Sequence, residues 1–260
     1  MQPEMAPMTT ENDAPLAEPA DLARAFALLS RLPVPGADGT RQARAAWAYP
    51  VVGLALGALA ALPAALALAL GLPAALAALL ALACLVILTG AMHEDGLADC
   101  ADGFWGGWEP ARRLEIMKDS RIGSYGVIAL TLGLAARWAA LWLLFDISVW
   151  AGAGALACAG ALSRATMPAL MAGLPNARGA GLSQSVGHVP PQTAGLAIAI
   201  AALAALLLTG CAALPALIWA ALVGLALARL AKAKIGGQTG DVLGATQQVT
   251  EIAVLFSLVA

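Results

Sequence analysis

The chain has 260 residues, of which 61% are apolar and only 12% charged, and its formal net charge is −2. Soluble domains carry about 25% charged residues, so this composition excludes an ordinary soluble protein. The near-neutral charge also indicates no nucleic-acid partner. Several apolar runs approach the roughly 20 residues that a helix needs to cross a bilayer. The sequence therefore predicts an all-α fold, a polytopic integral membrane helical bundle embedded in lipid.

Residues 1–20 are rich in Pro, Glu and Asp, and we expect a disordered cytoplasmic tail there. The stretch DLARAFALLSRLPVP predicts an amphipathic helix at the membrane interface, closed by its prolines. Six spanning helices are then predicted near residues 47–70, 72–92, 123–145, 149–172, 193–210 and 212–230, and a shorter, more polar seventh candidate covers 241–260. In the first span, Gly53 and Gly57 favour close helix packing. Residues 21–260 are thus expected to form a single membrane-embedded domain.

Basic residues predict the orientation. Of the 14 Lys and Arg residues, 12 lie in alternate connections, whereas the connections near residues 71, 147 and 211 have none. The positive-inside rule then places the N-terminus and residues 93–121 in the cytoplasm. The other two cations, Arg137 and Arg164, lie within spans. Arg137 is expected near the outer end of the third span, where it snorkels outward or pairs with Asp146.

The stretch HEDGLADCAD, residues 93–102, follows the second span directly and gathers four carboxylates and a histidine. If that helix continues past Gly90, three aspartates fall on one face at i, i+4 and i+7. Carboxylates this close repel one another unless a cation neutralises them, and Mg²⁺ takes one or two carboxylates plus phosphate oxygens. The alternative is a solvated acidic loop. The metal-ligating and catalytic candidates are therefore Glu94, Asp95, Asp99 and Asp102.

The next segment, EPARRLEIMKDSRIGSYG, predicts a helix from Pro110 and supplies four cations within ten residues. Cations beside a Mg²⁺ site indicate a phosphate or pyrophosphate substrate, although they also suit simple anchoring at the membrane. Arg164 is a further candidate, because a charge at the bilayer centre costs about 2.5–3.5 kcal/mol. The histidine at position 93 either binds substrate or only orients a carboxylate or caps the helix. The substrate-binding candidates are His93, Arg112, Arg113, Lys118, Asp119, Arg121, Ser163, Arg164, Arg178 and Asp241.

The blocks LTGAMHEDGLADCADGFWGG and RRLEIMKDSRIGSYGV resemble the signature of the cobalamin synthase (adenosylcobinamide-GDP ribazoletransferase) family. Similar blocks are FALLSRLPVPG near the start, SRATMPALM and ARGAGL in the middle, and GGQTGDVLGA near the end. The family usually reads TGGLHEDGLADTADG, from which Ala91, Met92 and Cys100 differ here. The resemblance implies a Mg²⁺-dependent transferase in the bacterial inner membrane, with residues 21–260 as its catalytic domain and the active site in the cytoplasm.

The implied reaction moves the adenosylcobinamide phosphate moiety from adenosylcobinamide-GDP to α-ribazole or its 5′-phosphate. It releases GMP and forms adenosylcobalamin or its 5′-phosphate. The preferred acceptor and a homo-oligomeric state stay open. From the residues alone, another Mg²⁺-dependent membrane phosphotransferase acting on a nucleotide-activated lipid fits the same site. A transporter fits less well, since transporters place ionisable groups near the midplane of repeated, broken helices.

Overall fold

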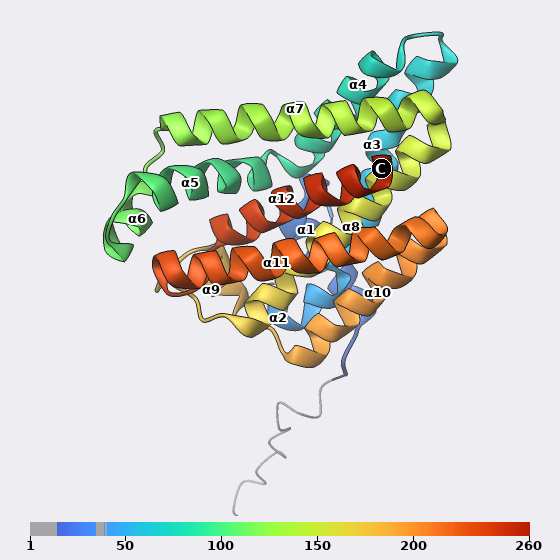
Figure 1. The fold of residues 1–260 in the computed structure, drawn as a ribbon. Coiled ribbons are helices and arrows are strands. Elements are labelled where there is room, and N and C mark those ends of the chain that lie inside the picture. The colour runs from blue at the N-terminus through green and yellow to red at the C-terminus, as the bar shows by residue number, and fades with distance from the viewer. Residues whose placement is uncertain (1–14, 35–38, 40) are drawn as a thin grey trace, which may run out of the picture.

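The computed structural model describes residues 15–34, 39 and 41–260, and helices dominate this part of the chain (Figure 1). The predicted tail lies outside the described residues up to position 14. In chain order the elements are α1 (Pro19–Leu29), α2 (Gln42–Ala45), the 3-10 helix η2 (Ala46–Ala48), α3 (Tyr49–Ala69), α4 (Ala74–Thr89), α5 (Met92–Gly106), α6 (Pro110–Ile116), α7 (Ser124–Ile147), α8 (Val149–Gly173), α9 (Leu182–Val186), α10 (Pro191–Thr209), the 3-10 helix η3 (Gly210–Ala212), α11 (Ala213–Ile235) and α12 (Gly240–Val259).

Five segments of the described chain are long and apolar enough to cross a membrane: 42–69, α7, α8, 191–235 and α12. The bent pair α4 and α5 makes a sixth. The segment 191–235 has 45 residues, and a helix of that length would extend well beyond the roughly 30 Å hydrocarbon core. Figure 1 shows the chain turning back at η3, so this segment is a hairpin of α10 and α11. The predicted polytopic all-α bundle is confirmed.

Helix α8 lies at the centre of the bundle. In the most apolar 18-residue stretch of α8, 89% of the residues are buried, whereas the corresponding share in residues 191–235 is 22%. Helix α8 packs closely on α3. The two backbones are so near each other that a Cβ added at Gly53 would lie 2.0 Å from the Gly160 carbonyl oxygen. A Cβ at Gly57 would likewise lie 2.6 Å from the Leu156 carbonyl oxygen. The close packing predicted from these two glycines is confirmed.

The predicted amphipathic helix is α1, and a buried carboxylate attaches it to the start of α3. Asp21 is fully buried and accepts a hydrogen bond of 2.9 Å from Trp47 Nε1. Burial raises the pKa of Asp21, but hydrogen bonds from Trp47, Arg41, the Glu18 backbone and Arg24 outweigh it, so the pKa lies below its usual value. The anchored helix holds its C-terminal leucines against the interior of the bundle.

The loops at the two ends of the bundle differ in charge. Figure 1 shows the connections near residues 71, 147 and 211 at one end, and α6, α9 and the turn before α12 at the other. The second end carries the basic residues around α6, before α9 and at the end of α11: Arg112, Arg113, Lys118, Arg121, Arg178, Lys232 and Lys234. These three connections, which the charge pattern assigned to one side of the membrane, therefore lie together in the structure.

We expect Gly160→Ala to destabilise the bundle, because its Cβ would lie 2.5 Å from the Gly53 carbonyl oxygen and force α3 and α8 apart. Overpacking of this kind costs about 1–3 kcal/mol, so the midpoint of thermal unfolding in detergent should fall. Gly173→Ala is the matched control, since nothing lies within 4 Å of that Cβ position in the same helix. Equal midpoints for the two variants would contradict the close helix contact.

Candidate active site

The acidic helix α5 is separate from α4. Gly90 and Ala91 both adopt left-handed backbone conformations, with φ of 64° and 57°, and the two helices meet at 86°. The prediction that the helix of the second span continues past Gly90 is therefore wrong, because a left-handed glycine closes α4 as a C-cap. The three aspartates Asp95, Asp99 and Asp102 still share one face, since α5 is itself helical.

Glycines bring α5 against α12. A Cβ at Gly96 would lie 2.8 Å from the carbonyl oxygen of Asp241, and a Cβ at Gly244 would lie 3.2 Å from the Cα of His93. Figure 1 shows α5 lying along both α12 and α7. The close approach places Asp241, in the first turn of α12, beside the acidic face of α5.

Asp95, Asp99 and Asp241 form what we call the acidic cluster. Asp95 is exposed, and the other two are half-buried. The charges that act on the Asp99 carboxylate come chiefly from Asp241, Asp95 and Arg178. Arg178 Nη1 lies 2.8 Å from Asp241 Oδ2. Within the described chain, neither Asp95 nor Asp99 has a hydrogen bond or ion pair from its side chain, so both carboxylates could serve as ligands of a cation.

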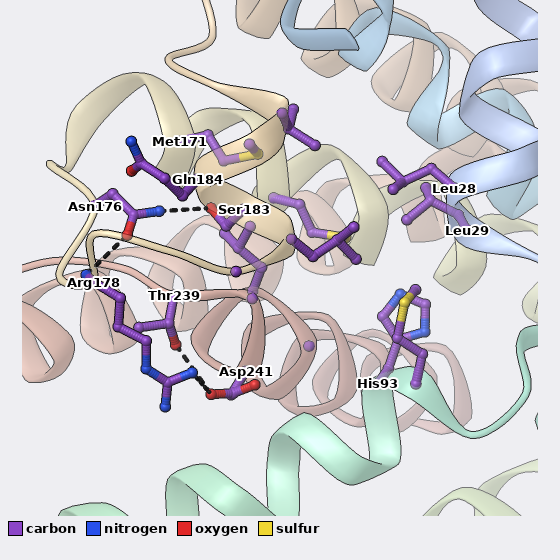
Figure 2. A pocket seen from close by; sticks show the side chains of 18 of the residues that line it. Leu28, Leu29, His93, Met171, Asn176, Arg178, Ser183, Gln184, Thr239 and Asp241 are labelled. Atoms are coloured by element: carbon purple, nitrogen blue, oxygen red, sulfur yellow. Dashed lines mark hydrogen bonds and ion pairs between the residues drawn. The ribbon is translucent and has the colours of Figure 1, made fainter. Parts of the chain in front are cut away.

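A backbone pairing between two loops holds Arg178 in place. Ala177 N–H donates to the Gln238 carbonyl at 2.8 Å, and Gln238 N–H donates to the Pro175 carbonyl at 2.9 Å. The loop after α8 is thereby attached to the residues that begin α12. Figure 2 shows the resulting contact, in which the Arg178 guanidinium reaches Asp241.

Asp102 caps the next helix. Its carboxylate accepts hydrogen bonds from the backbone N–H of Gly123 at 2.7 Å and of Gly126 at 2.9 Å, at the start of α7. A helix N-terminus favours negative charge, so these two hydrogen bonds hold the Asp102 carboxylate at the start of α7. In the part of the chain that the structure describes, no three His, Cys, Asp or Glu side chains are arranged to hold a metal ion by themselves. Asp95 and Asp99 therefore remain the α5 candidates, with Asp241 added from α12.

Glu94 points into the bundle and pairs with Arg137. Arg137 Nη1 donates to Glu94 Oε1 and to Gln248 Oε1, both at 2.7 Å, and its Nε lies 2.9 Å from Glu251 Oε1. Arg137 is only 1% exposed, so the prediction that it snorkels outward or pairs with Asp146 is wrong. Two carboxylates from α5 and α12 compensate its charge in the interior, where an unpaired charge would be strongly destabilising.

Two candidates from α8, Ser163 and Arg164, extend this interior arrangement. Gln247 Nε2 donates to Ser163 Oγ at 3.0 Å. Arg164 Nη1 donates to the Gly160 carbonyl of its own helix at 3.2 Å, and the carboxylates whose charge acts on it are Glu251 and Glu94. We call the whole set the buried network: Glu94, Arg137, Ser163, Arg164, Gln247, Gln248 and Glu251. It joins α5, α7, α8 and α12 behind the acidic cluster.

A cavity of about 160 Å³ opens beside the acidic cluster (Figure 2). Asp95, Asp241 and Arg178 line it together with His93. His93 is 1% exposed, and its Nε2 has no hydrogen-bond partner among the described residues. The structure therefore brings four of the predicted site residues to one cavity.

The predicted cations of residues 112–121 do not line this cavity. Arg113 donates to a carbonyl of α11 at 2.8 Å, which is a packing contact. Arg112 forms an exposed ion pair within α6, and Lys118 is exposed. Arg121 pairs with Asp119 at the surface, and its hydrogen bonds lower the pKa of Asp119 to about 2. These charges lie at the end of the molecule that carries α6, outside the enclosed part of the site.

Comparison with known proteins supports the family resemblance that the motifs of the sequence indicated. The profile of the family described as Cobalamin-5-phosphate synthase matches residues 21–259. The chain belongs to this family. A relative named adenosylcobinamide-GDP ribazoletransferase from Bradyrhizobium diazoefficiens is 48% identical over 241 residues, which cover 91% of this chain and 92% of the relative. Relatives of the same name from Mesorhizobium japonicum and Rhizobium meliloti are 46% and 42% identical, and they cover 90% and 92% of this chain and 91% and 95% of their own lengths. No solved structure gives a significant match.

In this member of the cobalamin-5-phosphate synthase family, the sequence pattern indicated Glu251 as a polar residue of the last segment but not its place in the buried network, and it did not indicate Gln247 or Gln248. All three lie in a helix apolar enough to span a membrane. Ionisable groups in such helices almost always face the bundle interior, and this was the signal that could have placed Glu251 there. The cation that pairs with Glu251 is Arg137 of α7, and the spacing of residues in the sequence does not predict how α7 packs against α12.

We expect Arg137→Met to destabilise the protein strongly, because it leaves Glu94 and Glu251 buried without their cation. Removing one partner of a buried pair costs about 3–5 kcal/mol. Thermal unfolding in detergent, followed by loss of helical circular dichroism, measures the effect. Arg112→Met is the control, since its ion pair is exposed. An Arg137→Met variant as stable as the control would contradict the pairing.

Proposed function

We propose that this chain transfers the adenosylcobinamide phosphate moiety from adenosylcobinamide-GDP to α-ribazole or its 5′-phosphate and releases GMP. Relatives 41–48% identical over about nine-tenths of the chain are named for this activity. The structural observation that supports it is a pair of carboxylates, Asp95 and Asp99, that have no protein partner in the described chain. Asp95 lines the cavity together with Arg178 and Asp241, and the charges of Asp95, Asp241 and Arg178 act on Asp99. Such a site suits a negatively charged pyrophosphate and an alcohol acceptor.

In the proposed reaction a ribose hydroxyl of the acceptor attacks the phosphorus that carries the cobinamide. A new P–O bond forms while the bond to the bridging oxygen breaks, and that oxygen leaves with GMP. The hydroxyl proton passes to a carboxylate, and a positioned general base of this kind contributes about 10²–10⁴-fold. Asp95 and Asp99 are the carboxylates placed to receive it, because no described side chain or backbone group occupies their oxygens.

We propose Mg²⁺ as the cofactor, held by Asp95 and Asp99 together with pyrophosphate oxygens. The residues fit this ion, since Mg²⁺ is usually bound through one or two carboxylates plus substrate phosphates and not by a full protein cage. When bound, the ion would neutralise charge on the departing GMP. Arg178 contributes a guanidinium whose fork matches phosphate geometry, and the contact with Asp241 at 2.8 Å orients it.

The protein would act in the bacterial inner membrane, with its N-terminus and the α6–α9 end in the cytoplasm. The basic connections around α6, before α9 and before α12 lie at that end, and the positive-inside rule favours such an end for the cytoplasmic face. The acidic cluster lies toward the same end, because Asp241 stands in the first turn of α12. A nucleotide-activated substrate in the cytoplasm would then reach the cavity without crossing the membrane.

We expect Asp95→Asn and Asp99→Asn each to lower kcat/KM for GMP release by about 100-fold or more, because each removes a charged group that stabilises the transition state. Purified protein is assayed with adenosylcobinamide-GDP and α-ribazole at limiting Mg²⁺, and chelation of Mg²⁺ should abolish turnover of the parent. Glu109→Gln, an exposed carboxylate at the same end, is the control. Near-parental rates for both aspartate variants would refute the assignment.

The orientation has its own test, for which the chain supplies one reporter. Cys211 is exposed in the loop assigned to the outside, whereas Cys84, Cys100 and Cys158 are partly or fully buried. In a variant that keeps only Cys211, an impermeant thiol reagent should label intact spheroplasts. In a variant whose single cysteine replaces Gly106, labelling should require permeabilised cells. The reverse pattern would invert the proposed topology.

A further inference from the structure

The cavity beside the acidic cluster has two chemically different ends. At one end Arg178 and Asp241 face each other, as Figure 2 shows. At the other end the lining is apolar and comes from Leu28 and Leu29 of α1 and from methionines of α5 and α8. His93 lies beside the two leucines in this view. A ligand that fills the cavity must therefore have an apolar part and a polar part.

The size of the cavity limits what the apolar part can be. Its volume is about 160 Å³, and an apolar protein cavity of about 150 Å³ takes up a benzene molecule. The space therefore suits a small flat ring system and is too small for a corrinoid macrocycle or a complete guanosine diphosphate. Among the substrates of the proposed reaction, only α-ribazole has a small, flat and apolar base.

The methionines of the lining support a flat aromatic ligand. Met167 and Met171 are four residues apart on α8, so they lie on one face of that helix, and Met92 lines the same cavity from the start of α5. Both α8 methionines are buried, with 5% and 2% of their surface exposed. Methionine side chains adapt their shape and make favourable contacts between sulfur and aromatic rings.

His93 provides an independent indication that a ligand belongs here. Its Nε2 is buried and has no hydrogen-bond partner within the described residues, which is unusual for a buried polar atom. Of the next two residues, Glu94 belongs to the buried network and Asp95 lines the cavity. A hydroxyl group of a ligand seated among the methionines would satisfy the free nitrogen.

We propose that this cavity is the acceptor pocket, in which the apolar base of the nucleoside packs against Met167, Met171 and Met92. The ribose then points toward the acidic cluster, and His93, which also lines the cavity, can bond a hydroxyl group of the bound nucleoside. The assignment rests on the proposed function, from which the nucleoside acceptor is taken. It makes Met171 and Met167 the residues that set which bases are accepted, and His93 a residue that positions the sugar.

The test measures α-ribazole binding directly by isothermal titration calorimetry on the purified protein in detergent, beside KM for each substrate. Met171→Trp fills the apolar end, so Kd and KM for α-ribazole should rise about tenfold or more, while KM for adenosylcobinamide-GDP stays near the parental value. Met171→Ala enlarges the end and is the safer substitution for folding. It should improve binding of a riboside whose base carries a third fused ring, relative to α-ribazole.

Met117→Ala is the matched control, because Met117 is equally buried but lies outside the cavity. Unchanged α-ribazole binding in both Met171 variants, or no binding by the parent, would overturn the acceptor pocket. A rise of KM for adenosylcobinamide-GDP alone, with GMP still released, would also overturn it and leave the proposed function intact. If the parent binds α-ribazole in a Met171-dependent manner yet releases no GMP, the pocket stands and the proposed function fails.

Discussion

Arg137 carries its charge in the interior of the bundle, and three helices must stay together to keep it paired. Its guanidinium joins Glu94 on α5 to Gln248 and Glu251 on α12, with α7 supplying the arginine itself. Since a buried carboxylate without its cation is strongly destabilising, α5 is fixed in rotation about its own axis. Successive residues of a helix point about 100° apart, so holding Glu94 inward turns Asp95 toward the cavity. The position of the site follows from this pairing.

Close backbone contacts make that arrangement possible. The left-handed residues at the end of α4 let the chain turn by 86° and begin α5 anew. Gly96 and Gly244 then allow α5 and α12 to approach within a distance that any larger side chain would prevent. As a result Asp241 reaches a neighbouring helix whose acids are about 145 residues away in sequence. The glycines of the acidic block therefore serve helix packing at least as much as access of a ligand.

Much of the fold was predictable because it depends on local patterns. Apolar runs, basic connections and a pair of glycines four residues apart depend only on sequence near each position, and they predicted the spans, the alternation of the connections and a close helix contact at α3, although not that α8 is the partner. The helical face of Asp95 and Asp99 follows from spacing in the same way. The partners of Arg137, the capping role of Asp102 and the start of α5 were not predictable, because each depends on a second segment distant in sequence. A charge within a span indicates a partner but does not name it.

The buried network and the acidic cluster differ in their charge balance, and this difference separates residues that stabilise the fold from residues available to a ligand. In the buried network the two carboxylates Glu94 and Glu251 meet the two cations Arg137 and Arg164, so the interior needs no further ion. In the acidic cluster three carboxylates meet the single guanidinium of Arg178, which leaves two negative charges. Two excess charges beside an open cavity attract a divalent cation, and a pyrophosphate can share such an ion. The proposed Mg²⁺ site is thus the place where the protein leaves its own charges unbalanced.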